Sequence, residues 1–317
     1  MEVIALILPA FAVMLTGYVF ARLNLLPESV ETELIRFLFY VAVPAIMFGT
    51  IAEQNLQGLL NWPFIMAFGS ATAIVFVFAL TGSLIYQKGN LGAATMSSMT
   101  PVVANTAIIG LPLLHSLFGK PGVVLASLAN ILIVVLLLIE VVLLEAVETK
   151  SQSGPWSRLQ AMRNAVLNPI VLSTLLGVAY AVSPLPMPVM AGSYFDTLGA
   201  AVAPCALFAV GMSLRPASLL ESGGPVFILA GLKLIVLPCI ALALVELLNI
   251  NSLVAVAVVL CAALPTAKNQ FILSQRYRQA EQLTTNMVSL TTVASVATLL
   301  LWLLLLARLY PSAFSAN

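Results

Sequence analysis

Long apolar stretches dominate the chain, and they constrain its fold more than any other feature. A hydrocarbon layer about 30 Å thick is crossed by roughly 20 apolar residues in a helix, and windows of that length occur ten times. Apolar residues make up 61% of the sequence and charged residues 8%. A soluble domain cannot hide this much apolar surface, because folded chains of about 300 residues still leave roughly a quarter of their unfolded surface in water. The sequence therefore predicts an all-α membrane protein.

The apolar windows predict ten transmembrane helices joined by short connections. We expect them near residues 3–22, 33–53, 62–87, 93–118, 121–147, 163–183, 194–214, 225–248, 252–276 and 282–308. The longest polar connection, residues 149–162, is rich in turn-forming residues and is interpreted as a cytoplasmic linker. It divides the chain into two halves of five helices.

The two halves share proline, glycine and asparagine positions in the same order. Three sets of anchors recur at a spacing of 160 to 164 residues: Pro9 and Gly17 with Pro169 and Gly177, Pro44 with Pro204, and Pro101 and Asn105 with Pro265 and Asn269. Because five helices is an odd number, the second half enters the membrane from the opposite side. The pattern predicts a 5+5 inverted repeat, which is typical of secondary transporters.

The distribution of Lys and Arg predicts the orientation, because cytoplasmic loops keep the excess of positive charge. With the N-terminus outside, nine of these residues fall at cytoplasmic helix ends and two at outer ends. We therefore expect a multi-pass protein of a bacterial cytoplasmic (inner) membrane, with both termini periplasmic or extracellular.

The fourth and ninth predicted spans contain residues that interrupt helices. Pro101, Gly110 and Pro112 lie in the fourth span and Pro265 in the ninth. Proline removes a backbone donor, and the freed carbonyls are tolerated at membrane depth only inside protein or beside a wet cavity. Matching interruptions in inverted halves predict broken, crossing helices around a midplane site, whose half-helix N-termini suit a carboxylate. The alternative is that these prolines only kink two packed helices.

Three ionisable residues within the spans are candidates for function. Lys268 either attracts a substrate anion or titrates in proton coupling, and the alternative is that it extends to the membrane surface. Lys233 has the same alternatives without support from the repeat. Glu140 lies five residues before Glu145, which favours a solvated helix end over proton coupling. Substrate contacts are expected near Asn105 and Asn269, with Thr106 and Gln270 beside them.

Other chemistries lack their residues. Segments 97–112 and 262–275 hold no Asp or Glu, so sodium coupling is less expected than proton coupling or exchange. The net charge of +1 and the absence of a basic run argue against nucleic acid. The sequence contains no zinc-protease, serine-hydrolase or phosphate-loop motif. We expect no catalytic residues, no metal and no cofactor.

Several of these stretches together resemble the auxin efflux carrier family of membrane transporters, which includes bacterial permeases for small organic acids. The resemblance is carried by the Asn105-Thr106 run through Gly110-Leu111-Pro112-Leu113, by Asn168-Pro169 and by residues 263–267. It implies substrate contacts at Asn105 and Asn168, a scaffold from helices 1, 2, 6 and 7, and a mobile transport part from helices 3–5 and 8–10. It also implies elevator-like movement and a homodimer formed through the scaffold. The corresponding ranges are 1–60 and 163–222 for the scaffold, and 61–148 and 223–310 for the transport part.

The sequence thus predicts a secondary active transporter of a small organic anion, working in the lipid bilayer by alternating access. One alternative is a channel or uniport pore for a neutral solute. A second is a membrane sensor that binds a ligand without moving it.

Overall fold

The computed structural model describes residues 2–27, 29–53, 61–148, 169–183, 185–213 and 223–314, and within them the chain is helical. The prediction of an all-α chain is confirmed for these residues. The first half contains α1 (Glu2–Arg22), α2 (Ser29–Phe37), η1 (Leu38–Ala42), α3 (Val43–Ala52), α5 (Trp62–Tyr86), α6 (Leu91–Met99), η2 (Thr106–Gly110) and α7 (Leu111–Glu148). The second contains α9 (Pro169–Val182), α10 (Val189–Ala200), α11 (Val202–Ser213), α12 (Gly224–Gly231), η4 (Leu232–Val236), α13 (Leu237–Leu247), α14 (Ser252–Ala263), α15 (Lys268–Tyr277), α16 (Glu281–Leu309) and α17 (Pro311–Phe314). The linker 149–162 lies outside the described residues.

Six helical stretches of the described chain are long and apolar enough to cross a membrane. They are Ser29–Ala52, Trp62–Tyr86, Thr106–Leu144, Val189–Met212, Gly224–Leu247 and Glu281–Leu309. Shorter apolar helices cover Ala12–Arg22, Leu172–Val182 and Ser252–Ala263. The stretch 106–144 joins two predicted spans, but Gly119 interrupts it with φ 59° and ψ −142°, close to the predicted boundary.

Prolines locate the irregular turns inside the long helices. The three π-helical segments η1, η2 and η4 each end two residues before a proline, namely Pro44, Pro112 and Pro238. Proline cannot donate the backbone hydrogen bond that a regular turn needs, and a widened turn relieves its contact with the preceding carbonyl. These prolines therefore widen their helices without ending them.

Asparagine side chains begin the two short helices α6 and α14. Asn90 accepts a hydrogen bond from the backbone of Ala93 at the start of α6, and Asn251 accepts one from Leu253 at the start of α14. Asparagine is a favoured N-cap because its side-chain oxygen pairs with a backbone N–H that the first turn leaves free. Both caps lie at the ends of the helices that face away from the interruptions.

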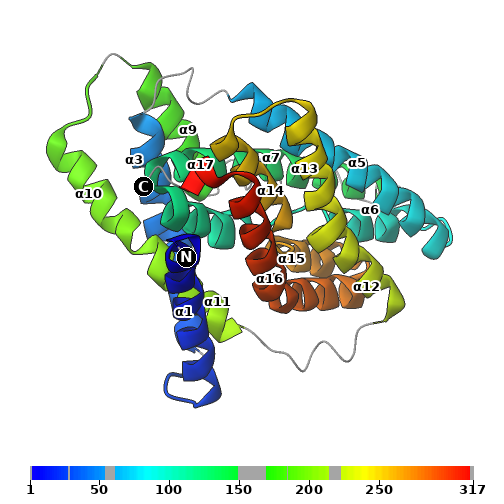
Figure 1. Ribbon diagram of the computed structural model, residues 1–317. Helices are drawn as coiled ribbons and strands as arrows, with labels where there is room; N and C mark the ends of the chain where they lie inside the picture. The colour runs from blue at the N-terminus through cyan, green and yellow to red at the C-terminus, as the bar shows by residue number, and fades with distance from the viewer. Residues whose placement is uncertain are drawn as a thin grey trace.

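The helices form two groups, with α7 running between them (Figure 1). One group contains α1, α3, α9, α10 and α11, and the other contains α5, α6 and α12 to α16. In the first group α1 packs along α11 and α3 along α9. In the second, α5 packs on α6 and α13 on α14. In the first group, helices of the second half therefore pair with helices of the first half, and in the second group α5 also packs against α13 and α14.

Glycines bring helix backbones into direct contact in the first group. A Cβ atom at Gly17 of α1 would lie 2.1 Å from the carbonyl oxygen of Phe208 in α11. One at Gly177 of α9 would lie 3.2 Å from the carbonyl oxygen of Phe48 in α3. Gly17 and Gly177, like Phe48 and Phe208, are separated by the spacing of the sequence repeat. The same type of contact thus recurs with the halves exchanged.

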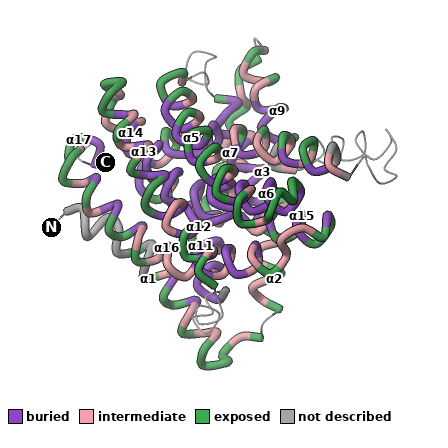
Figure 2. Tube along the Cα trace, turned by 90° about the vertical axis from the view of Figure 1, so that its right-hand side faces the viewer, coloured by how far each residue is buried: buried purple, intermediate pink, exposed green. Residues whose placement is uncertain are grey.

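The most enclosed helices of the described chain are the two short ones. In α6 residues 92–99 are all buried, and in α14 residues 255–263 are all buried (Figure 2). Apart from their first residues, both helices are enclosed by protein, so their last turns must find hydrogen-bond partners within the protein.

Candidate substrate site at two interrupted helices

The two interruptions meet at one place in the molecule. Residues 103–105 and 265–267 run antiparallel, and Ala104 and Thr266 form a single β-type bridge. The backbone N–H of Asn105 donates to the carbonyl oxygen of Pro265 at 2.9 Å, and that of Ala267 donates to Val103 at 2.9 Å. Backbone groups that the broken helices leave free therefore satisfy one another at the crossing.

Buried hydroxyl groups hold the crossing in place. The backbone N–H of Thr266 donates to the side-chain oxygen of Thr291 at 3.1 Å, and the Thr266 hydroxyl donates to the carbonyl oxygen of Thr100 at 2.8 Å. Thr100, Thr266 and Thr291 are all fully buried. Gly110 lies directly against Leu264 of the second interruption, since a Cβ atom there would lie 2.6 Å from a terminal methyl group of the Leu264 side chain.

Two helices begin at the crossing, and neither has a side-chain cap. The π-helical turn η2 begins at Thr106 after Asn105, and α15 begins at Lys268 after Ala267. This contrasts with the asparagine caps at the starts of α6 and α14. Helix N-termini carry partial positive charge and unpaired N–H groups, so two of them at one crossing favour an anion.

The predicted substrate residues occupy different environments. Asn105 is buried at the crossing, Asn269 is exposed in the first turn of α15, and the Thr106 hydroxyl donates to the Asn130 side chain of α7 at 3.1 Å. Asn168 lies outside the described residues. Pro101 and Pro265 are at the interruptions, whereas Pro112 lies inside α7, one residue after its start.

Lys268 contacts a carboxylate that the sequence did not indicate as its partner. Its Nζ lies 3.1 Å from Oε1 of Glu31 in α2, and both side chains are partly exposed. The two residues are 237 positions apart, so no local pattern relates them. A second ion pair joins Lys120 at the kink of α7 to Glu53 at 2.8 Å and to Asp196 of α10 at 3.5 Å. The first pair joins α15 to α2, and the second joins α7 to α10 and to the residue that follows α3.

Lys233 is completely buried, so the alternative that it reaches the membrane surface is wrong. It lies in η4, and its Nζ donates to the carbonyl oxygen of Ala262 at 3.2 Å. That carbonyl belongs to the last turn of α14, where helix carbonyls lack partners and carry partial negative charge. Lys233 therefore closes the end of α14 just before the crossing.

Glu140 is also completely buried, and the interpretation as a solvated helix end is wrong. Helix α7 continues to Glu148, so Glu140 lies about 12 Å from the helix end at 1.5 Å per residue. The Gln270 amide donates to Glu140 Oε2 at 2.6 Å. A carboxylate thus reaches the first turn of α15, although segments 97–112 and 262–275 contain none.

The polar residues missed by sequence reasoning were Asn130, Thr266, Thr291 and Glu31. An asparagine within the apolar run of α7 is a signal that could have found Asn130, because polar side chains at membrane depth usually need a partner. Hydroxyl groups of threonine commonly bond to their own helix, so Thr266 and Thr291 carried no comparable signal.

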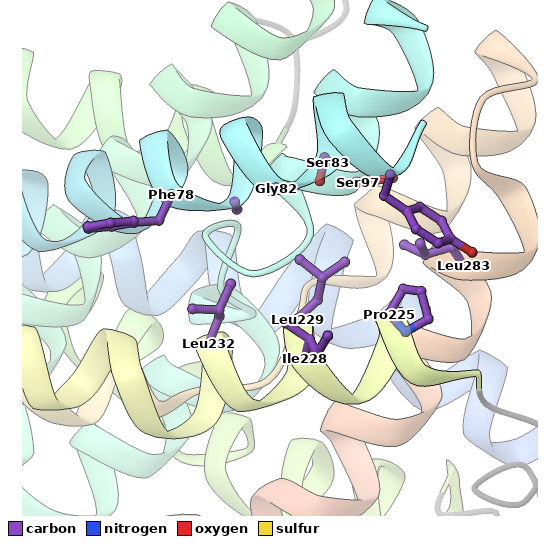
Figure 3. Close-up of a pocket in the computed structure, with 11 residues that line it drawn as sticks. Phe78, Gly82, Ser83, Ser97, Pro225, Ile228, Leu229, Leu232 and Leu283 are labelled. Atoms are coloured by element: carbon purple, nitrogen blue, oxygen red, sulfur yellow. The ribbon is translucent and has the colours of Figure 1, made fainter. Parts of the chain in front are cut away.

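A cavity of about 200 Å³ lies between α5 and α12 (Figure 3). Its walls are mostly apolar, with Phe78 and Gly82 on one side, Leu229 and Leu232 on the other, and Leu283 from α16 at one end. None of the predicted substrate residues lines it. Phe78 is 67% exposed, as expected for a side chain that faces lipid.

Interrupted helices that cross inside an apolar helical protein are typical of membrane transporters. Residues 2–303 match the family model described as "Membrane transport protein". The chain belongs to this family, the auxin efflux carrier-like transporters whose resemblance the sequence carries.

Relatives of different names match over most of the chain. A protein of Rhizobium meliloti (strain 1021) named "Putative malonate transporter" is 28% identical over 309 residues, which cover 94% of this chain and 93% of the relative. A protein of Methanothermobacter thermautotrophicus named "Uncharacterized transporter" is 25% identical, with 93% of this chain and 96% of the relative covered. The mouse "Lysosomal cholesterol signaling protein" is 25% identical over 77% of this chain and 30% of its own length.

Proposed function

We propose that the protein is a secondary active transporter of a small carboxylate anion. The observation that carries this proposal is the meeting of two uncapped helix starts, at Thr106 and Lys268, beside the buried Asn105. The two helix starts carry partial positive charge, the Lys268 ammonium carries a full positive charge, and the Asn105 amide is a hydrogen-bond donor. Together these groups favour a carboxylate over a neutral solute. The name of the Rhizobium relative supports malonate as the first candidate.

The proposed architecture has ten membrane segments in two inverted halves. The fourth would consist of α6, the crossing residues and the part of 106–118 before Gly119, and the ninth of α14, the crossing residues and α15. Reciprocal contacts of Gly17 with Phe208 and of Gly177 with Phe48 support the repeat. The two helix groups of Figure 1 support a division into a scaffold (1–60 and 163–222) and a transport part (61–148 and 223–310).

Elevator-type alternating access is the proposed movement. The transport part would carry the crossing as a rigid unit past the scaffold, exposing the site to each side in turn. Two ion pairs cross the boundary between the parts, Lys268 with Glu31 and Lys120 with Glu53 and Asp196. Exposed ion pairs of this kind contribute about 1 kcal/mol or less, so thermal motion can break them during transport. A homodimer through the scaffold, in a bacterial cytoplasmic membrane, completes the proposal.

Counterflow of labelled carboxylates tests the function directly. Purified protein in liposomes loaded with unlabelled malonate should take up external labelled malonate transiently against its gradient, and Asn105→Ala should reduce this uptake. A channel for a neutral solute would show neither counterflow nor saturation. If the protein were a sensor, malonate would raise the melting temperature of the protein without any flux of malonate. Either result would contradict the proposal.

A further inference from the structure

The pair formed by Glu140 and Gln270 is the least satisfied polar contact among the described buried residues. Both side chains are fully buried, and a single hydrogen bond of 2.6 Å joins Gln270 Nε2 to Glu140 Oε2. The two remaining oxygens, Oε1 of Glu140 and Oε1 of Gln270, have no hydrogen-bond partner. Buried polar atoms of native proteins are nearly always paired, so two unpaired acceptors in one contact call for a donor or a cation.

No described cation compensates the Glu140 carboxylate. The described ion pairs of the chain involve Arg36, Lys120 and Lys268, and none of them reaches Glu140. The neighbouring helix α6 has no ionisable side chain, and α15 carries Lys268, Arg276 and Tyr277. On the other helices that pack against α7, the ionisable side chains with described surroundings are Tyr18, Arg22, Tyr86, Tyr180, Cys205 and Cys261. An ionised carboxylate in this position would be buried with one neutral amide as its partner, which is costly.

A single proton would satisfy the whole contact. On Glu140 it removes the negative charge, turns one carboxyl oxygen into a donor and offers that donor to Gln270 Oε1. The acid and the amide then pair through two hydrogen bonds, one in each direction. An added donor therefore accounts for both unpaired oxygens, whereas the ionised form leaves both unpaired.

We propose that Glu140 and Gln270 form a proton-binding site that couples the transport of the anion to a proton. Gln270 is in the first turn of α15, two residues after Lys268, so this site and the crossing share one helix start. An ionised Glu140 repels an anion at that helix start, and a protonated Glu140 does not. Anion and proton therefore favour each other's binding, by reciprocity of linked equilibria, and travel in the same direction. This inference rests on the proposed carboxylate transport.

Uphill accumulation of malonate tests the coupling. Wild-type protein in liposomes is given equal malonate on both sides, a membrane potential clamped near zero, and a pH gradient with both buffers above the pKa values of malonate. Coupling to a single proton predicts malonate accumulation of about tenfold for each pH unit, on the alkaline side. Protein-free liposomes measure the leak. Accumulation driven by a sodium gradient at equal pH, in place of a pH gradient, would overturn the proposal.

Glu140→Gln separates coupling from transport, because its carboxamide resembles the protonated acid in shape and charge. This variant is expected to exchange malonate but to lose the accumulation driven by the pH gradient. Glu33→Gln, which removes an exposed acid on α2, is the matched control and should accumulate malonate like the wild type. Accumulation by Glu140→Gln at the wild-type level would overturn the inference.

Two further results distinguish a failure of the proton-site proposal from a failure of the proposed transport function. Wild-type protein that exchanges malonate but never accumulates it under a pH gradient refutes the proton site alone, and wild-type protein without exchange of any carboxylate refutes the transport function. If Glu140→Gln does not fold, proton uptake by detergent-solubilised wild type decides the question. Addition of malonate in weak buffer should take up protons from solution, and the absence of uptake would contradict the coupling.

Discussion

Two kinds of interface in the molecule are built on opposite physical principles. Between α1 and α11, and between α3 and α9, helices touch through glycine and apolar side chains, and the backbones leave no space for a Cβ atom at Gly17 or Gly211. At the crossing, strand-like backbone hydrogen bonds and buried threonine hydroxyls join residues 103–105 to residues 265–267. The glycine interfaces depend on steric fit, and the crossing is polar because broken helices expose their ends. This contrast is consistent with a scaffold that stays fixed, beside a crossing that binds the substrate.

The largest expected effect is at the glycine interface. Gly211→Val would place a branched side chain where even a Cβ atom would lie only 1.9 Å from the carbonyl oxygen of Met14. Overpacking of this kind typically costs about 3 kcal/mol or more when the obstacle is backbone, and we expect loss of monodisperse protein. Gly69→Ala in α5 is the control, because a Cβ atom there meets nothing within 4 Å. Size-exclusion profiles and thermal unfolding measure both; a stable Gly211→Val protein would refute the rigid contact.

The next effect is on the polar crossing itself. Lys268→Met removes the full positive charge at the start of α15 and should lower the initial rate of malonate counterflow about 30-fold, equivalent to about 2 kcal/mol of binding. Melting temperature should change little, because the side chain is partly exposed. Lys88→Met, at an exposed turn after α5, is the matched control. Counterflow that is equal in the two variants would remove Lys268 from the site.

A smaller effect is expected where Lys233 closes the end of α14. Lys233→Met leaves the Ala262 carbonyl without its donor and should lower the free energy of unfolding by about 1 kcal/mol. Trp302→Phe gives a comparison, since Trp302 donates to the carbonyl of Leu234 in the same π-helical segment at 3.0 Å. Both variants should have a lower melting temperature than the wild type in detergent. A higher melting temperature for Lys233→Met would show that burial of the ammonium costs more than its hydrogen bond contributes.

The smallest effect concerns the ion pair between Lys268 and Glu31. Glu31→Gln frees Lys268 for the substrate and should lower the KM for malonate about twofold, as expected for a partly exposed pair worth about 0.5 kcal/mol. Glu33→Gln on the same helix breaks the exposed pair with Arg36 at 3.1 Å and should leave KM unchanged. An increase in KM for Glu31→Gln would instead show that Glu31 contributes to substrate binding.

Sequence patterns predicted those parts of the molecule that depend on local chemistry. Helix content, the interruptions at Pro101 and Pro265 and the boundary near Gly119 follow from hydropathy and from the missing donor of proline. The partner of Lys268 and the burial of Glu140 could not be predicted from these local patterns. Both depend on contacts between residues more than a hundred positions apart, and on which face of a helix points inward. In a helix that is apolar on all faces, such as α7, periodicity does not identify that face.

The central claim is that a carboxylate binds where the two interrupted helices cross, and a structure by cryo-electron microscopy in lipid nanodiscs with saturating malonate tests it most directly. The account predicts ligand density between the starts of η2 and α15, with one carboxylate within hydrogen-bond distance of Asn105 or Lys268. Density for malonate elsewhere, with residues 103–105 and 265–267 enclosed and empty, would contradict it.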